Sequence, residues 1–248
     1  MSTSVTSRVA VIFGAGSNVG AALATGFRSA GYRVATVSRS GETTSPDDKG
    51  EKPFHIKADL SDPSAALGVL DKVRQSGWPF PSVIVWNAAS LTPPDSSDPQ
   101  NPFSIPSDGF DRDLRLQVKS PFLVAGEAVK AWRDDSAAQS GRRGTFIVTG
   151  NATPRRIFAP LLTTLGVGKS ALNYWVGTAD GALKEQGIRE ALLVSTSFFF
   201  ADERSPEGGP VSKPNGDSHA KFYLNLAEGK EDLPYYVTFR NGRYERID

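Results

Sequence analysis

Short apolar runs alternate with longer amphipathic segments along most of the chain. Runs rich in β-branched and aromatic residues predict strands at 8–13, 33–38, 54–60, 82–89, 144–150 and 191–200. Helical periodicity predicts helices from about residue 19 and over 63–76, 110–132 and 165–184. A last helix at 219–228 precedes a seventh apolar run at 234–239 and a turn at Asn241-Gly242. Strands that alternate with helices predict parallel crossovers.

The predicted strands are apolar throughout, which is typical of a sheet covered by helices on both faces. We therefore expect one domain over 1–248, an α/β Rossmann fold with a doubly wound parallel sheet of about seven strands. Three segments rich in Pro, Gly, Ser and Asp, at 40–52, 91–106 and 202–217, are predicted to be loops. The third follows a strand at the carboxyl edge of the sheet, so it is a candidate cover for a substrate.

The composition and net charge limit the kinds of molecule that the protein is expected to bind. Hydrophobic residues make up 39% of the chain, and 28 Lys+Arg against 27 Asp+Glu leave a net charge of +1. No broad positive field exists to hold nucleic acid or an anionic membrane, and no apolar run reaches the ~20 residues of a membrane span. The start of the chain lacks the apolar core of a secretory signal. Cysteine is absent and there are two histidines, so we expect no metal site and a cytoplasmic protein. The expected partner is a small-molecule substrate.

A glycine-rich turn follows the first predicted strand and opens the first predicted helix. Glycines permit a tight turn and close backbone approach, while the helix start presents free N–H groups to a pyrophosphate. An ordinary strand-to-helix turn is the alternative interpretation. Gly20→Val is expected to weaken cofactor binding and leave the fold largely intact. The turn residues assigned to a dinucleotide are Gly14, Gly16, Ser17, Asn18, Val19 and Gly20.

The second predicted strand ends in Ser38-Arg39-Ser40. An NAD-binding fold usually places a carboxylate here against the ribose 2′-hydroxyl, and a carboxylate would repel a 2′-phosphate. Arg39 instead offers a charge-assisted pair to that phosphate, with a hydroxyl on either side. The pattern favours NADP(H), and a solvated surface arginine is the alternative.

With these residues in place, the chain resembles the short-chain dehydrogenase/reductase superfamily over 8–184. The turn resembles the family's TGxxxGxG motif, with Asn18 in the place of the middle glycine. Asp59-Leu60 resembles the family's acidic site that binds the adenine amino group, although a helix-capping or surface carboxylate is the alternative for Asp59. Asn87-Ala88-Ala89-Ser90 resembles the NNAG motif, which implies that Asn87, Ala88 and Ala89 lie along the cofactor.

The family's YxxxK motif, in which tyrosine transfers a proton, matches 165–169 with Leu165 in the place of the tyrosine and Lys169 retained. Leucine cannot transfer a proton, so the resemblance implies an atypical member that lacks the usual acid. Lys169 is expected to clamp the nicotinamide ribose, and acting as the acid itself is the alternative. Gln117 takes the place of the family's helix asparagine. The proline-glycine pair that usually follows the sixth strand is missing.

The family's catalytic serine falls in the segment 149–153. Asn151 aligns with it and could donate a hydrogen bond to a developing oxyanion, with Thr149 and Thr153 as alternatives. Asp202 and Tyr223, in or near the covering loop, are candidates for a replacement acid, although we expect a solvated loop carboxylate and an aromatic residue on a helix face. Tyr174 lies about 140° around the helix from Lys169 and is expected to pack.

These residues predict an NADPH-dependent reductase of a small hydrophobic carbonyl, imine or activated alkene. A binding or regulatory protein that binds NADP(H) but catalyses no reaction is one alternative. A non-redox cyclase or isomerase in the same pocket is another. The family resemblance also implies a homo-oligomer, a dimer or tetramer.

Overall fold

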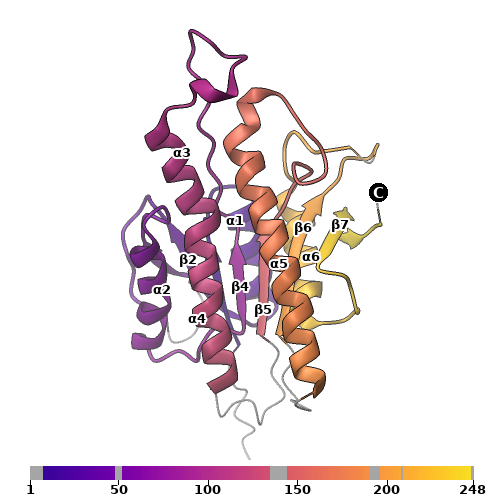
Figure 1. Cartoon of the computed structure of the whole chain (residues 1–248). Coiled ribbons are helices and arrows are strands. Elements are labelled where there is room, and N and C mark those ends of the chain that lie inside the picture. Colours follow the sequence, from indigo (N-terminus) through magenta and orange to yellow (C-terminus); the bar gives the residue numbers. More distant parts are fainter. Residues whose placement is uncertain (1–7, 48–51, 135–143, 190–195, 208, 247–248) are drawn as a thin grey trace, which may run out of the picture.

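A single sheet forms the centre of the computed structural model, which describes residues 8–47, 52–134, 144–189, 196–207 and 209–246 (Figure 1). The strand order is β3-β2-β1-β4-β5-β6-β7-β8, with β1 to β7 parallel and β8 antiparallel to β7. The predicted doubly wound parallel sheet is confirmed, with one short strand added. The strands are β1 (Val9–Phe13), β2 (Arg33–Ser38), β3 (Phe54–Lys57), β4 (Val83–Trp86), β5 (Gly144–Thr149), β6 (Thr196–Glu203), β7 (Tyr236–Arg240) and β8 (Arg243–Tyr244).

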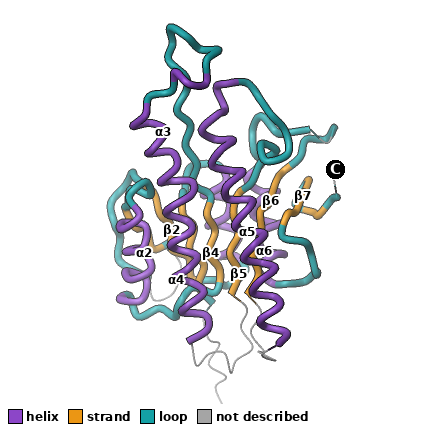
Figure 2. The backbone as a smooth tube through the Cα atoms, in the orientation of Figure 1, coloured by secondary structure: helices purple, strands orange, loops and turns teal. Residues whose placement is uncertain are grey.

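Helices cover both faces of the sheet (Figure 2). Helices α1 and α6 pack on one face, and α2, α4 and α5 pack on the other. The predicted helix at 110–132 is longer and contains a π-helical turn, Arg115–Lys119, between α3 and α4. No helix among the described residues is long and apolar enough to cross a membrane. The helices are α1 (Val19–Ser29), α2 (Pro63–Gln75), α3 (Ser107–Leu114), α4 (Ser120–Asp134), α5 (Thr163–Arg189) and α6 (Gly216–Glu228).

Alternation along the strands explains why they are apolar throughout. In β1, Val11 and Phe13 face the α4–α5 layer, whereas Ala10 and Ile12 face the α1–α6 layer, and all four are fully buried. Successive side chains of a strand point to opposite faces, so a sheet covered on both sides needs apolar residues at every position.

Strand β6 differs from its prediction at both ends. The predicted run began at 191, and residues 191–195 lie outside the described part of the chain. At the other end β6 continues beyond Phe200, because the ladder to β7 pairs Asp202 with Thr238 and Glu203 with Phe239. The loop predicted at 202–217 therefore begins after Glu203, and it ends earlier as well, since α6 begins at Gly216. Ladder pairing carries the strand into a polar segment that its own sequence marks as a loop.

The predicted turn at Asn241-Gly242 joins β7 to β8. Both residues have positive φ, 51° and 72°, as a two-residue hairpin turn requires. The Gly242 backbone N–H donates to Ser218 Oγ at 2.9 Å and so ties this hairpin to α6.

Candidate functional site

The glycine turn between β1 and α1 contains glycines of two kinds. A Cβ on Gly14, whose φ is +88°, would lie 2.5 Å from the backbone nitrogen of Ala88. A Cβ on Gly20 would lie 2.5 Å from Ala15 Cα, so valine there would disturb the fold, contrary to the sequence-based expectation. These glycines serve packing within the protein itself. A Cβ on Gly16 would meet no protein atom within 4 Å, which leaves room for a ligand.

Two adjoining cavities follow the carboxyl edge of the sheet from this turn. One, of about 490 Å³, extends to Lys169 on α5, and the other, of about 510 Å³, extends to the turn after β2. Gly14 and Gly16 line both, so the two form one cleft where the strand order reverses between β1 and β4. The cleft brings together every residue that the sequence assigns to the site: Gly14, Gly16, Ser17, Asn18, Val19, Gly20, Ser38, Arg39, Ser40, Asp59, Leu60, Asn87, Ala88, Ala89, Asn151 and Lys169.

The end of the cleft beyond β2 presents an arginine. Ser38 Oγ donates to the Ser40 carbonyl at 2.8 Å, and His55 Nε2 lies 2.9 Å from the same carbonyl. Because that oxygen can only accept, Nε2 carries the proton, and Nδ1 of His55 faces Thr36 Oγ1 at 3.1 Å. These bonds fix the short turn on which Arg39 lies exposed.

Asp59 lies beside this turn with one oxygen already engaged. Its Oδ1 accepts from the Ser61 backbone N–H at 3.0 Å and from Ser61 Oγ at 2.8 Å. The backbone bond is the main cause that lowers the pKa of this carboxyl, so Asp59 is ionised at neutral pH. Helix α2 is capped instead by Asp62, whose side chain accepts from the Ser64 backbone N–H. The helix-capping interpretation of Asp59 is therefore wrong.

The opposite end of the cleft contains a buried lysine. Lys169 is 3% exposed, and its Nζ donates to the Thr149 carbonyl at 2.6 Å. Burial lowers its pKa to about 8, so the amine still carries a proton at neutral pH. Leu165 lines the same cavity one helical turn earlier on α5.

Within the described residues, the amide NH₂ of Asn151 has no acceptor at this end of the cleft. Its Oδ1 accepts from both the backbone N–H and the Oγ1 of Thr153, at 3.0 and 2.6 Å. The carbonyl half of the amide is thus occupied, and the NH₂ half remains able to donate. The Thr153 hydroxyl donates its proton to this hydrogen bond, so Asn151 is the better donor of the two toward a substrate.

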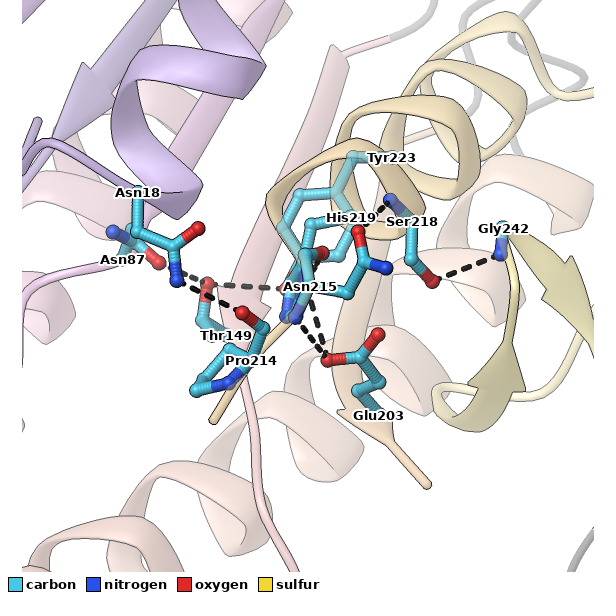
Figure 3. Close-up of polar contacts among 10 residues, drawn as sticks. All are labelled: Asn18, Asn87, Thr149, Glu203, Pro214, Asn215, Ser218, His219, Tyr223 and Gly242. Atoms are coloured by element: carbon cyan, nitrogen blue, oxygen red, sulfur yellow. Dashed lines mark hydrogen bonds and ion pairs between the residues drawn. The ribbon is translucent and has the colours of Figure 1, made fainter. Parts of the chain in front are cut away.

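Thr149 is the centre of a buried hydrogen-bond chain (Figure 3). Its Oγ1 accepts from the Tyr223 hydroxyl at 3.0 Å and donates to Asn87 Oδ1 at 2.9 Å, while Asn87 Nδ2 donates to the Gly14 carbonyl at 2.8 Å. The chain links α6 through the end of β5 to the glycine turn. The hydroxyl protons of Thr149 and Tyr223 are both committed inside the protein.

Tyr223 lies on a helix face, as the sequence predicted, whereas Asp202 does not lie where it was expected. Tyr223 is fully buried, and this burial raises the pKa of its hydroxyl far above the usual range, so it is a poor proton donor. Asp202 is no solvated loop residue: it belongs to β6 and is 1% exposed. Its Oδ2 lies 2.7 Å from Arg204 and accepts from the Tyr236 hydroxyl at 2.8 Å, while burial raises its pKa. Arg204 is a neighbour along the chain, whereas Tyr236 comes from β7, 34 residues later.

Two residues near Lys169 lie outside the cleft. Tyr174 does point away from Lys169, but the expected packing is wrong, because its side chain is 78% exposed. Gln117 is fully buried in the π-helical turn, where its Nε2 donates to the Thr164 carbonyl at 3.4 Å. A Cβ on Gly168 would lie 2.8 Å from Gln117, so the glutamine packs directly against α5.

Helix α6 and the loop before it form one wall of the cavity that contains Lys169. Asn18 Nδ2 donates to the Pro214 carbonyl at 2.8 Å, which ties this loop to the glycine turn (Figure 3). Glu203 Oε2 accepts from the Asn215 backbone N–H at 2.9 Å and lies 3.6 Å from His219 Nδ1. Glu203, Pro214 and His219 all line the cavity that contains Lys169. The sequence predicted a covering loop at 202–217, but it gave no sign of these contacts to the glycine turn and to His219.

Comparison with known proteins identifies the family. No family model matches the chain. The chain is 31% identical over 247 residues to the short chain dehydrogenase/reductase dmxR12 from Cryptosporiopsis sp. (strain 8999), an alignment that covers 96% of this chain and 94% of that protein. The chain belongs to the short-chain dehydrogenase/reductase family. As a member of this family, it is an oxidoreductase.

Solved short-chain dehydrogenase/reductase structures share the fold. A metagenomic short-chain oxidoreductase in complex with NADP has a TM-score of 0.69 at 19% identity, covering 94% of this chain and 96% of that one. The NADH-dependent reductase A1-R′, responsible for alginate metabolism, has a TM-score of 0.73 at 17% identity, covering 95% and 96%. At these identities the likeness shows the Rossmann sheet and its helices.

Proposed function

We propose that this family member is an NADPH-dependent reductase of a small hydrophobic carbonyl, imine or activated alkene. The observation that carries the proposal is the single cleft, which joins an exposed arginine beyond β2 to a buried lysine on α5 through the glycine turn. The two joined cavities suit a dinucleotide, with Arg39 at its phosphate-bearing adenosine end and Lys169 at its reactive end.

The residues of the cleft fit the cofactor. Gly16 leaves an open space where a larger side chain would stand. Asn18 precedes α1 without a side-chain bond to the helix start, whereas α2 and α6 are capped by Asp62 and Asn215. The Ala21 N–H donates to the Gly16 carbonyl at 2.9 Å, so among the described residues the N–H groups of Val19 and Gly20 are left for a pyrophosphate. Arg39 would hold the 2′-phosphate, and Asp59 would accept from the adenine amino group.

The substrate end combines one polar donor with an apolar wall. NADPH, when bound, supplies a hydride. The free amide N–H of Asn151 would orient the substrate oxygen or nitrogen, and Leu165 would favour a hydrophobic substrate. Lys169 would hold the ribose hydroxyls from the α5 side. Pro210, Val211, Ser212 and Pro214, in the loop before α6, line the same cavity and would cover the substrate.

The source of the proton is the unusual feature of this mechanism. We propose that Leu165 takes the place of the family's tyrosine, so no hydroxyl stands one turn before Lys169. The hydroxyls of Thr149 and Tyr223 are committed elsewhere, and Asp202 is held by Arg204 and Tyr236. Water or the substrate itself would then supply the proton. The rate enhancement would come from holding the substrate close to the cofactor and from the electrostatics of the site. Substrates that need little protonation should be reduced best.

A substrate panel tests the proposal against its alternatives. Purified protein is mixed with NADPH and with simple ketones, cyclic imines and enones, and absorbance follows the reduced cofactor. Oxidation of NADPH that depends on substrate supports the reductase. Binding of NADPH without turnover would instead support a silent regulatory protein. Conversion of a substrate without NADPH consumption would support a cyclase or isomerase.

Lys169→Met is expected to raise the Michaelis constant for NADPH roughly 10- to 100-fold, because a charge-assisted hydrogen bond is lost. Turnover at saturating NADPH should fall much less. In the parent, NADPH affinity should decline as pH rises through about 8, where Lys169 loses its charge, and the variant should lack this decline. Abolished turnover with unchanged NADPH affinity would instead make Lys169 the proton donor.

The two kinds of glycine in the turn give a matched pair of variants. Gly16→Val fills space that the protein leaves open, so NADPH affinity should fall at least about tenfold at an unchanged melting temperature. Gly20→Val should lower the melting temperature by several degrees, because its side chain meets the backbone of Ala15. Calorimetry and thermal unfolding measure both effects. Full NADPH affinity in Gly16→Val would place the pyrophosphate elsewhere.

We also propose that the chain forms a homo-oligomer through α4 and α5. Phe122, Leu123, Val167 and Tyr174 expose apolar surface on these two helices. Phe122 and Trp175 pack edge to face between the two helices, so the exposed residues belong to one layer. Association would bury this surface and give Tyr174 the packing that it lacks in the single chain.

A further inference from the structure

A buried histidine in the cleft wall has no role in the mechanism above. His219 is 2% exposed, lies on α6 and lines the cavity that contains Lys169. Its ring packs edge to face against Tyr223 and Phe239, with ring centroids 5.4 and 5.0 Å away. The ring therefore has one fixed orientation, and its two nitrogens are not equivalent.

The hydrogen bonds of His219 define which nitrogen carries the proton. Nδ1 lies 2.8 Å from the Asn215 carbonyl, which can only accept, so the hydrogen is on Nδ1 (Figure 3). Burial is the main cause that lowers the pKa of the ring below its ordinary value, despite the Glu203 carboxylate at 3.6 Å, so the imidazole is neutral at pH 7. Nε2 is then a lone-pair acceptor, and no residue in the described part of the chain is seen to bond to it.

A bound dinucleotide has few hydrogen-bond donors that could reach Nε2 of His219. Phosphates carry no proton to donate at neutral pH. The adenine amino group and the 3′-hydroxyl of the adenosine ribose belong to the Asp59 end of the cleft, in the other cavity. The ribose hydroxyls at the reactive end are assigned to Lys169, which approaches from α5, and α5 covers the opposite face of the sheet from α6. The remaining donor is the NH₂ of the nicotinamide carboxamide.

We propose that Nε2 of His219 accepts a hydrogen bond from the nicotinamide carboxamide, which makes His219 a positioning residue for the cofactor. With Lys169 on one side and His219 on the other, the nicotinamide ring is held at two points and cannot rotate about its bond to the ribose. The inference rests on the cofactor site of the proposed function. It does not depend on turnover.

A cofactor analogue isolates this bond. Reduced 3-acetylpyridine adenine dinucleotide phosphate replaces the carboxamide NH₂ by a methyl group and keeps the rest of NADPH. Dissociation constants of both are measured by calorimetry for the parent and for His219→Phe, which keeps a ring between Tyr223 and Phe239. The parent should prefer NADPH by about tenfold, and the variant by less than about twofold. Tyr244→Phe on β8, which lines neither cavity of the cleft, is the control and should keep the full preference.

Nitrogen NMR provides a second readout on the parent itself. The chain has two histidines, so His219 is assigned by comparison with His55→Phe. The Nε2 resonance of His219 should shift on saturation with NADPH and stay in place with the analogue, and this decides the matter if His219→Phe does not fold. A full preference for NADPH in His219→Phe, or an unmoved Nε2 resonance, overturns the role of His219 alone. Absence of NADPH binding to the parent overturns the cofactor site as well.

Discussion

Leu165→Tyr is expected to raise turnover on simple ketones by ~10²- to 10⁴-fold, the usual contribution of general acid catalysis. Leu165 lines the reactive cavity one helical turn before Lys169, so a tyrosine there brings a hydroxyl beside the Lys169 ammonium. The ammonium lowers the pKa of a phenol that it approaches, which favours proton transfer near neutral pH. Turnover numbers with NADPH and a series of ketones measure the effect.

Leu165→Phe is the control for this experiment, because it adds the same ring without the hydroxyl. A rise seen in the tyrosine variant and absent from the phenylalanine variant assigns the gain to proton donation. Equal turnover in both would mean that the hydroxyl does not reach the site that Asn151 lines. A parent that already reduces simple ketones as fast as Leu165→Tyr would show that another group supplies the proton.

The parts of the fold and site that sequence could predict are those set by local chemistry. Alternating strands and helices are visible as periodicity, and the glycine turn needs only its own residues and the strand and helix beside it. The helical angle between Lys169 and Tyr174 correctly placed them on different faces. It said nothing of what covers the second face, so the exposure of Tyr174 was missed.

The errors concern residues whose surroundings are assembled over long distances in sequence. Asp202 resembles a loop acid until β7 extends β6 and brings Tyr236 to its carboxylate. Tyr223 lies on the expected helix face, but its own sequence could not show that its hydroxyl donates to Thr149, 74 residues earlier. His219 gave no signal, because its value as an acceptor depends on the Asn215 carbonyl that fixes its tautomer. Pairings of this kind follow from topology, not from local pattern.

Arg39→Asp is expected to reverse the cofactor preference from NADPH to NADH. Loss of a charge-assisted bond to the 2′-phosphate costs roughly 10- to 100-fold in NADPH affinity, and the new carboxylate adds repulsion. NADH lacks that phosphate, so its affinity should change little or improve as the carboxylate accepts from the 2′-hydroxyl. The turn itself should persist, since Ser38, Ser40 and His55 hold it through bonds that do not involve the Arg39 side chain.

The reversal must come from the site and not from the change in net charge. Arg243→Asp makes the same charge change on β8, at the opposite edge of the sheet from β2 and β3, and is the matched control. It should leave the ratio of the two affinities unchanged. Because Arg39 is exposed, the NADPH preference of the parent should also shrink as salt rises from about 0.05 to 0.5 M, while NADH affinity stays nearly constant. Equal affinity of the parent for NADPH and NADH at low salt would contradict the assignment of Arg39 to the 2′-phosphate.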